Sequence, residues 1–295
     1  CRCIETMTTT KEKVRKSKKL VSSKDLVIDV KLAEIKTIDT PALVVNIFRG
    51  VKKPKGATGA VDDALDGAIT QLIQDGEIKG SAGETTLIHT FGKIKPKRVL
   101  VIGLGSQDEF DAQVIRRVSA EAVRFLRRKG ICKAATVAHG AGIGGFDPAL
   151  SGQSVAEGSY LGLYKFGIYL TKNRDSANEF ENLTVVESDK AKVEFIETGV
   201  HLGSAVADAV IKARDMVNEP ANHMTPSRMA EAANNISKEH KLGIEVLDNA
   251  QMKKMGMGAF MGVAQGTDEP AKLIILRYDG APSNPENNLG PVSYT

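Results

Sequence analysis

Residues 95–140 read KPKRVLVIGLGSQDEFDAQVIRRVSAEAVRFLRRKGICKAATVAHG, and this stretch decides the fold class. It opens with RVLVIG, an apolar run rich in β-branched residues that is typical of a buried strand. The period of an amphipathic helix follows, carried by Ile115, Val118, Ala122 and Phe125. A basic run before Gly130 is typical of a helix C-terminus, and ATVA from Ala135 is a second strand signal. Because strand, helix and strand alternate, the stretch predicts an α/β fold with a largely parallel sheet.

The residues before this stretch extend the same pattern. LVIDV from Leu26 and LVVNIF from Leu43 are short strand signals, and a glycine-rich segment then leads into a further strand. One helix is predicted by apolar residues at the helical period, namely Val61, Ala64, Leu65, Ala68, Ile69 and Leu72. After the central stretch, residues 154–163 predict another helix.

A polar segment, residues 172–189, follows this half of the chain. Beyond it, an apolar stripe keeps helical spacing for about four turns, through Leu202, Ala205, Val206, Ala209, Val210, Ala213, Met216 and Val217. Pro220 prevents this helix from continuing. Thr225 before Pro226 is an N-cap signal for the next helix, which we expect to end at Gly243.

The last part of the pattern contains the strand signal IEVL, a short helix around Met252 and Met255, and the strand signal AKLIILRY. We therefore expect three parts. A basic tail covers residues 1–23, an N-terminal α/β domain with a mixed or parallel sheet and flanking helices covers 24–190, and a second α/β region covers 191–295.

The composition of the 295 residues, 42% hydrophobic and 26% charged, is ordinary for a soluble globular protein. No apolar run approaches the roughly 18 to 20 residues of a membrane helix, and the opening residues have no apolar core of a secretory signal. These observations predict a cytoplasmic protein without a membrane segment. The chain begins with Cys1, and Met7 is the first residue that could start translation, which suggests a fragment.

Three features raise a nucleotide or nucleic-acid binding module as an alternative. Much of the net charge of +4 lies in the first 19 residues, but no aromatic side chains alternate with these charges, so a solvated tail is the simpler interpretation. Gly103 and Gly105 follow a predicted strand, yet Asp108 stands where a dinucleotide fingerprint has its third glycine. The glycine-rich loop from His139 lacks the Lys-Ser or Lys-Thr pair of a P-loop.

The residues able to bind metal or act as nucleophiles are scattered. The histidines form no HExxH pair and are His89, His139, His201, His223 and His240. Three cysteines, Cys1, Cys3 and Cys132, make no disulfide framework, and Cys132 has no neighbouring His in the sequence. NEPANHMTP, residues 218–226, predicts a helix exit, a turn and a capped helix start.

Two segments carry a specific resemblance to a known family. ARDMVNEPANHMTPSRMAEAA and IEVLDNAQMKKMGMGAFMGVAQGTDEPAKLIILRYDG resemble the opening of the catalytic domain of the leucine aminopeptidase (cytosol aminopeptidase) family. The segment KPKRVLVIGLGSQDEFD also resembles the N-terminal α/β domain of that family, with lower specificity. The resemblance implies a two-domain subunit of a homohexamer that removes N-terminal residues, often Leu, from peptides with two divalent metals, zinc or manganese.

The same resemblance implies that residues 191–295 are an incomplete metallopeptidase domain. The metal ligands of the family lie in GKGxxFDSGG and NTDAEGR segments downstream of a strand like LIILRYDG, and neither segment occurs in this sequence. Asp268, Glu269 and Asp279 are the acidic residues near that point, and we interpret them as loop or strand-end residues. We therefore assign no catalytic, cofactor-binding or metal-binding residue and expect these 295 residues alone to be inactive.

A second alternative is a structural function. An inactive copy could join intact homologous subunits and change their assembly, since it would keep assembly surfaces without the catalytic residues. Whether the chain is an enzyme by itself is left open by the sequence, although the family consists of hydrolases. A peptide substrate and a homo-oligomeric partner are implied only for the intact form.

Overall fold

The computed structural model describes residues 26–141, 145–169 and 179–280. These residues divide into two compact units between Lys212 and Ala213, inside one long helix. The domain boundary predicted from the sequence lies near residue 190, on the N-terminal side of this division. The basic tail predicted over residues 1–23 lies outside the described residues.

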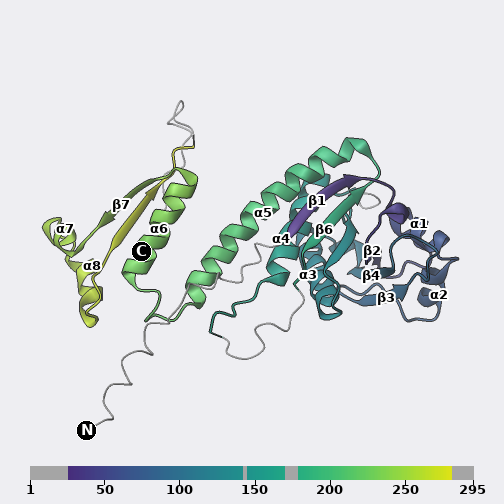
Figure 1. The fold of residues 1–295 in the computed structure, drawn as a ribbon, viewed down its shortest axis with the longest axis horizontal. Coiled ribbons are helices and arrows are strands. Elements are labelled where there is room, and N and C mark those ends of the chain that lie inside the picture. Colours follow the sequence, from purple (N-terminus) through teal and green to yellow (C-terminus); the bar gives the residue numbers. More distant parts are fainter. Residues whose placement is uncertain (1–25, 142–144, 170–178, 281–295) are drawn as a thin grey trace, which may run out of the picture. The chain divides into compact units, whose positions relative to one another are not determined.

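Among the described residues of the first unit, six strands form one sheet (Figure 1). Its order is β1–β6–β5–β2–β4–β3, and only the edge pair β3–β4 is antiparallel. The strands are β1 (Val27–Leu32), β2 (Leu43–Phe48), β3 (Thr85–His89), β4 (Arg98–Gly105), β5 (Lys133–Val137) and β6 (Asn182–Glu187). The predicted α/β class with a mostly parallel sheet is confirmed.

Helices cover both faces of this sheet. One face carries α1 (Gly56–Ala64) and α2 (Ala68–Gln74), and the other carries α3 (Ala112–Arg128), α4 (Pro148–Leu163) and α5 (Lys190–Asn218). Because side chains alternate along a strand, β2 supplies both cores: Val44 packs with α3 and α4, whereas Leu43 and Val45 pack with α1 and α2. The central strands are therefore buried on both sides, as expected for parallel strands.

The second unit contains a smaller sheet. Antiparallel strands β7 (Gly243–Leu247) and β8 (Leu273–Arg277) are accompanied by α6 (Pro226–His240), α7 (Asn249–Lys254) and α8 (Gly258–Val263). Its small core gathers around the fully buried Met252. Thr225 caps α6 as predicted, because its hydroxyl oxygen accepts the backbone N–H of Arg228 at 3.4 Å.

The structure corrects two predicted helices. The single helix expected over residues 61–72 is two helices. Asp66 and Gly67 have φ of 56° and 78°, and these left-handed conformations interrupt the helical backbone hydrogen bonds. The helix expected to end at Gly243 ends at His240, where Lys241 takes the left-handed conformation with φ of 54°, and Gly243 begins β7.

No helix among the described residues has an apolar stretch long enough to cross a lipid bilayer.

Candidate functional site

The five histidines noted in the sequence differ in exposure. His89, His201, His223 and His240 are exposed, whereas His139 is buried. Within residues 26–141, 145–169 and 179–280, no group of three or more His, Cys, Asp or Glu side chains is arranged to hold a metal ion.

The acidic residues near the end of the second unit lie at its surface. Asp268 and Glu269 occupy the loop before β8, and the backbone N–H of Glu269 donates to the Thr267 hydroxyl at 3.2 Å. Asp279 follows β8 and is also exposed. Cys132, before β5, is partly exposed, with its sulfur 3.9 Å from the carbonyl oxygen of Gly130.

The glycine pair of the central stretch has a packing function. A Cβ at Gly103 would lie 2.0 Å from the carbonyl oxygen of Ser81, and one at Gly105 would lie 3.1 Å from the Cβ of Ala82. Both glycines belong to β4, and their backbone bonds reach the segment before β3. These glycines let the backbone of residues 80–82 lie directly against the strand.

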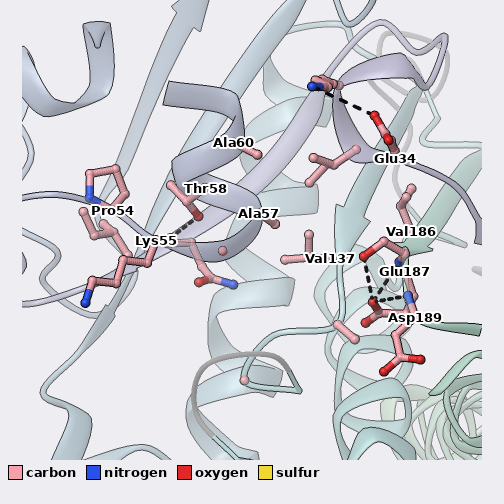
Figure 2. Close-up of a pocket in the computed structure, with 18 of the residues that line it drawn as sticks. Glu34, Pro54, Lys55, Ala57, Thr58, Ala60, Val137, Val186, Glu187 and Asp189 are labelled. Atoms are coloured by element: carbon pink, nitrogen blue, oxygen red, sulfur yellow. Dashed lines mark hydrogen bonds and ion pairs between the residues drawn. The ribbon is translucent and has the colours of Figure 1, made fainter. Parts of the chain in front are cut away.

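One pocket of about 780 Å³ opens in the first unit. It lies at the carboxyl ends of β1, β2, β5 and β6 and beside the start of α1. Figure 2 shows Pro54, Lys55, Ala57 and Thr58 on one side, with Glu34, Glu187 and Asp189 on the other. The volume falls in the range of small-molecule sites, roughly 300 to 1,000 Å³.

The position of the pocket follows from the strand order. The connection that leaves β2 runs through α1 and α2 over one face toward β3 and β4, whereas the connection that leaves β5 runs through α4 over the other face to β6. Since β2 and β5 are neighbours, their connections separate above the carboxyl ends of these two strands. Ligands of open α/β sheets bind at this kind of topological switch point.

A polar pair links the pocket lining to the buried side chain of His139. Asn46 on β2 lines the pocket, and its Nδ2 lies 2.8 Å from Nδ1 of His139. Thr58 of α1 donates its hydroxyl to the carbonyl oxygen of Asn46 at 2.7 Å. Burial lowers the pKa of His139 from 6.5 to about 4, so its ring is neutral at pH 7. The pair connects the ends of two central strands to the first turn of α1.

Sequence patterns alone do not identify this pocket. Its lining residues extend from Ala33 to Lys192 and come from several strand ends. One signal was present, since Asn46 is a polar residue inside the apolar strand LVVNIF. The glycine-rich loop noted at His139 contributes Gly140 to the lining, and residues 142–144 of that loop lie outside the described residues.

Comparisons with known proteins identify the family. Residues 44–173 match the model of the N-terminal domain of the cytosol aminopeptidase family, and residues 211–290 match the model of its catalytic domain. The chain belongs to the cytosol aminopeptidase family. The resemblance noted in the sequence is thereby confirmed in both halves.

Curated members of the cytosol aminopeptidase family are similar over most of this chain. A probable cytosol aminopeptidase of Alkaliphilus oremlandii (strain OhILAs) is 38% identical over 256 residues, which are 86% of this chain and 50% of that protein. The cytosol aminopeptidase of Pseudomonas aeruginosa strain PAO1 is 32% identical over 253 residues, 85% of this chain and 50% of that protein. The chain thus spans about half the length of the curated relatives it matches.

Solved structures share the fold. A mutant of tomato leucine aminopeptidase superposes with a TM-score of 0.71 at 20% identity, covering 84% of this chain and 50% of that one. The bottromycin maturation enzyme BotP in complex with Mn gives a TM-score of 0.63 at 23% identity, covering 81% of this chain and 45% of that one.

Proposed function

We propose that this chain is the N-terminal part of a metal-dependent aminopeptidase that releases N-terminal amino acids, leucine among them, from peptides. The observation that carries the proposal is the match of both family domains in the order of the sequence, at residues 44–173 and 211–290. The segment NEPANHMTP between α5 and α6 lies within the matched catalytic residues and is part of the resemblance to that domain.

The described residues do not supply the metal site that the family implies. Two divalent ions need a dense cluster of carboxylates, and the acids nearest to that point, Asp268, Glu269 and Asp279, are exposed and form no such cluster. We infer that manganese or zinc binds only in a longer polypeptide that includes the GKGxxFDSGG and NTDAEGR segments. A related enzyme, BotP, has been solved in complex with Mn.

The finer properties implied by the family belong to the same proposal. A cytoplasmic location, a peptide substrate and a hexameric assembly are expected of the longer polypeptide. As the main function of the chain, a nucleotide-binding or nucleic-acid-binding module and an inactive partner subunit are not favoured, because the relatives at 32% and 38% identity are named aminopeptidases.

The test uses release of a chromophore from a leucine amide with added manganese or zinc. The 295-residue chain is compared with a chimera that continues it with the second half of the Alkaliphilus relative, which is 38% identical over the first half. We expect metal-dependent turnover from the folded chimera and none from the 295-residue chain.

Two results of this assay would contradict the proposal. Metal-dependent turnover by the 295-residue chain would show that the inactivity proposed for it is wrong. A chimera with the circular dichroism spectrum of the intact relative but no turnover, beside an active relative, would contradict the aminopeptidase proposal. Addition of a metal chelator to the active chimera is the control for metal dependence.

A further inference from the structure

The pocket at the switch point is built from residues outside the segment that resembles a catalytic domain. All of its lining residues belong to the first unit, and the segment that resembles a catalytic domain begins later, at residue 211. A pocket of about 780 Å³ could hold a ligand of mononucleotide size. Its position at the carboxyl ends of β2 and β5 is the one at which open α/β sheets bind ligands.

The two sides of the pocket differ in available charge. Lys53 and Lys55 line one side, and neither forms an ion pair with any described residue. On the other side, Asp189 pairs with Lys192 at 3.6 Å and Glu34 pairs with Lys36 at 4.0 Å. The side near α1 therefore carries two uncompensated positive charges.

The start of α1 adds backbone donors to the same side. The first backbone bond of the helix runs from the N–H of Gly59 to the carbonyl oxygen of Lys55 at 3.2 Å, and no side chain caps this end. The N–H groups of Gly56, Ala57 and Thr58 consequently have no acceptor within the helix. These three residues line the pocket together with the two lysines. Lysine ammonium groups and free helical N–H groups together form an environment that suits a phosphate group.

The floor and the opposite side have a different chemistry. Val137 and Ala57, which are both partly exposed, give the pocket apolar surface. Among the described residues Oδ1 of Asn46 has no hydrogen-bond partner, so it can accept a bond from a ligand. Glu187 lines the far side, where one of its carboxylate oxygens accepts from the backbone N–H groups of Ser188 and Asp189 at 2.8 and 3.0 Å. Its second oxygen is an acceptor that suits a sugar hydroxyl.

We propose that this pocket binds a nucleoside monophosphate or a ligand of the same chemistry. The phosphate contacts Lys53, Lys55 and the first N–H groups of α1. The ring lies on the apolar floor by Val137, and the ribose hydroxyls face the acidic side. This site does not include the glycine pair of β4, Gly103 and Gly105. The proposal leaves the aminopeptidase proposal unchanged.

The test is isothermal titration calorimetry of the 295-residue chain with AMP, and with adenosine, ribose 5-phosphate and inorganic phosphate as comparisons. The double substitution Lys53→Ala with Lys55→Ala removes the free charges. Lys52→Ala is the matched control, because Lys52 is exposed in the same loop but does not line the pocket. Ala57→Glu places a carboxylate in the first turn of α1, where it favours the helix and repels a phosphate.

We expect saturable AMP binding that falls about tenfold or more in the double variant and in Ala57→Glu, and that is unchanged in Lys52→Ala. Three results would overturn the proposal: no AMP binding at millimolar concentration by the folded chain, equal binding by all variants, or binding of adenosine as tight as that of AMP. Binding of ribose 5-phosphate or inorganic phosphate as tight as that of AMP would overturn the contribution of the apolar floor. Circular dichroism of each variant confirms that a loss of binding is not a loss of folding.

Discussion

The side-chain amide of Asn46 lies 2.8 Å from the ring nitrogen Nδ1 of His139, although 93 residues separate them in the sequence. The amide donates, so Nδ1 carries no proton, and the ring proton lies on Nε2, which is 3.5 Å from the Thr136 hydroxyl. A protonated ring would place a second donor against the amide, inside a site where the imidazole is 1% exposed.

Burial of the His139 ring predicts a pH-dependent stability. His139 has a pKa of about 4 in the folded chain against 6.5 normally, so between these values the unfolded state binds more protons. Stability present above pH 6.5 is lost as the pH falls toward 4. We expect the wild type to lose about 2 kcal/mol more than His139→Gln between pH 7 and pH 4.5. The measurement is urea unfolding followed by circular dichroism, since the chain has no tryptophan. Equal losses in the two proteins would contradict the assignment.

Asp62 of α1 caps the following helix, which predicts a loss of stability when it is removed. Its buried carboxylate accepts the backbone N–H groups of Ile69 and Thr70 at 2.8 and 3.0 Å. Asp62→Ala leaves these donors without an acceptor, and we expect a loss of about 1 to 3 kcal/mol in urea unfolding. Asp63→Ala is the control, because Asp63 is exposed and should change stability by less than about 0.5 kcal/mol. Equal effects of the two variants would show that the cap contributes little.

The ion pair between Arg116 of α3 and Glu157 of α4 predicts a non-additive double variant. Glu157 is buried and also accepts from Gln153 Nε2 at 2.6 Å. Arg116→Ala leaves this carboxylate without its positive partner, so we expect a loss of about 2 to 4 kcal/mol in thermal or urea unfolding.

The double change Arg116→Met with Glu157→Met should recover most of that loss, since no buried charge remains. Arg128→Ala breaks an exposed pair with Glu121 and should cost less than about 1 kcal/mol. A double variant less stable than Arg116→Ala would contradict this prediction. It would show that the ion pair stabilises the fold more than two methionines in its place do.

Close packing of α5 on α4 predicts that Gly199 cannot be replaced. A Cβ there would lie 1.9 Å from the carbonyl oxygen of Ala149, and a backbone atom cannot move aside as a side chain can. We expect Gly199→Ala to cost about 2 kcal/mol or more in urea unfolding. Thr198→Ala, at the exposed neighbouring position of the same helix, should leave stability nearly unchanged. A neutral Gly199→Ala would mean that the two helices can separate without cost.

The sequence predicts those elements whose signals are local. The amphipathic period from Ile115 to Phe125 and the basic run before Gly130 predicted a helix that the structure places at Ala112–Arg128. The break between α1 and α2 could not be predicted this way, because the apolar period continues through Leu65 and Ala68. It depends on hydrogen bonds that the backbone N–H groups of Ile69 and Thr70 donate to the carboxylate of Asp62, which periodicity does not report.

Local sequence patterns could not predict the candidate pocket either. Asn46, Lys55 and Glu187 become neighbours of one cavity only after the strands adopt the order β6–β5–β2. Strand order depends on which crossover covers which face, and several orders are compatible with the same series of strands and helices. The family resemblance did predict the domain types, since it rests on specific residues instead of on a period.

The glycines of α4 and α5 bring three helix backbones close together on one face of the sheet. Gly158 and Gly162 of α4 lie against α3, and Gly152 lies against the backbone of Ile196 in α5. Helix α4 is therefore enclosed between two helices and the sheet, and its middle turns have little access to solvent. Its amide protons should exchange with deuterium only when the first unit opens globally, so α4 would report the slowest exchange rate of the chain.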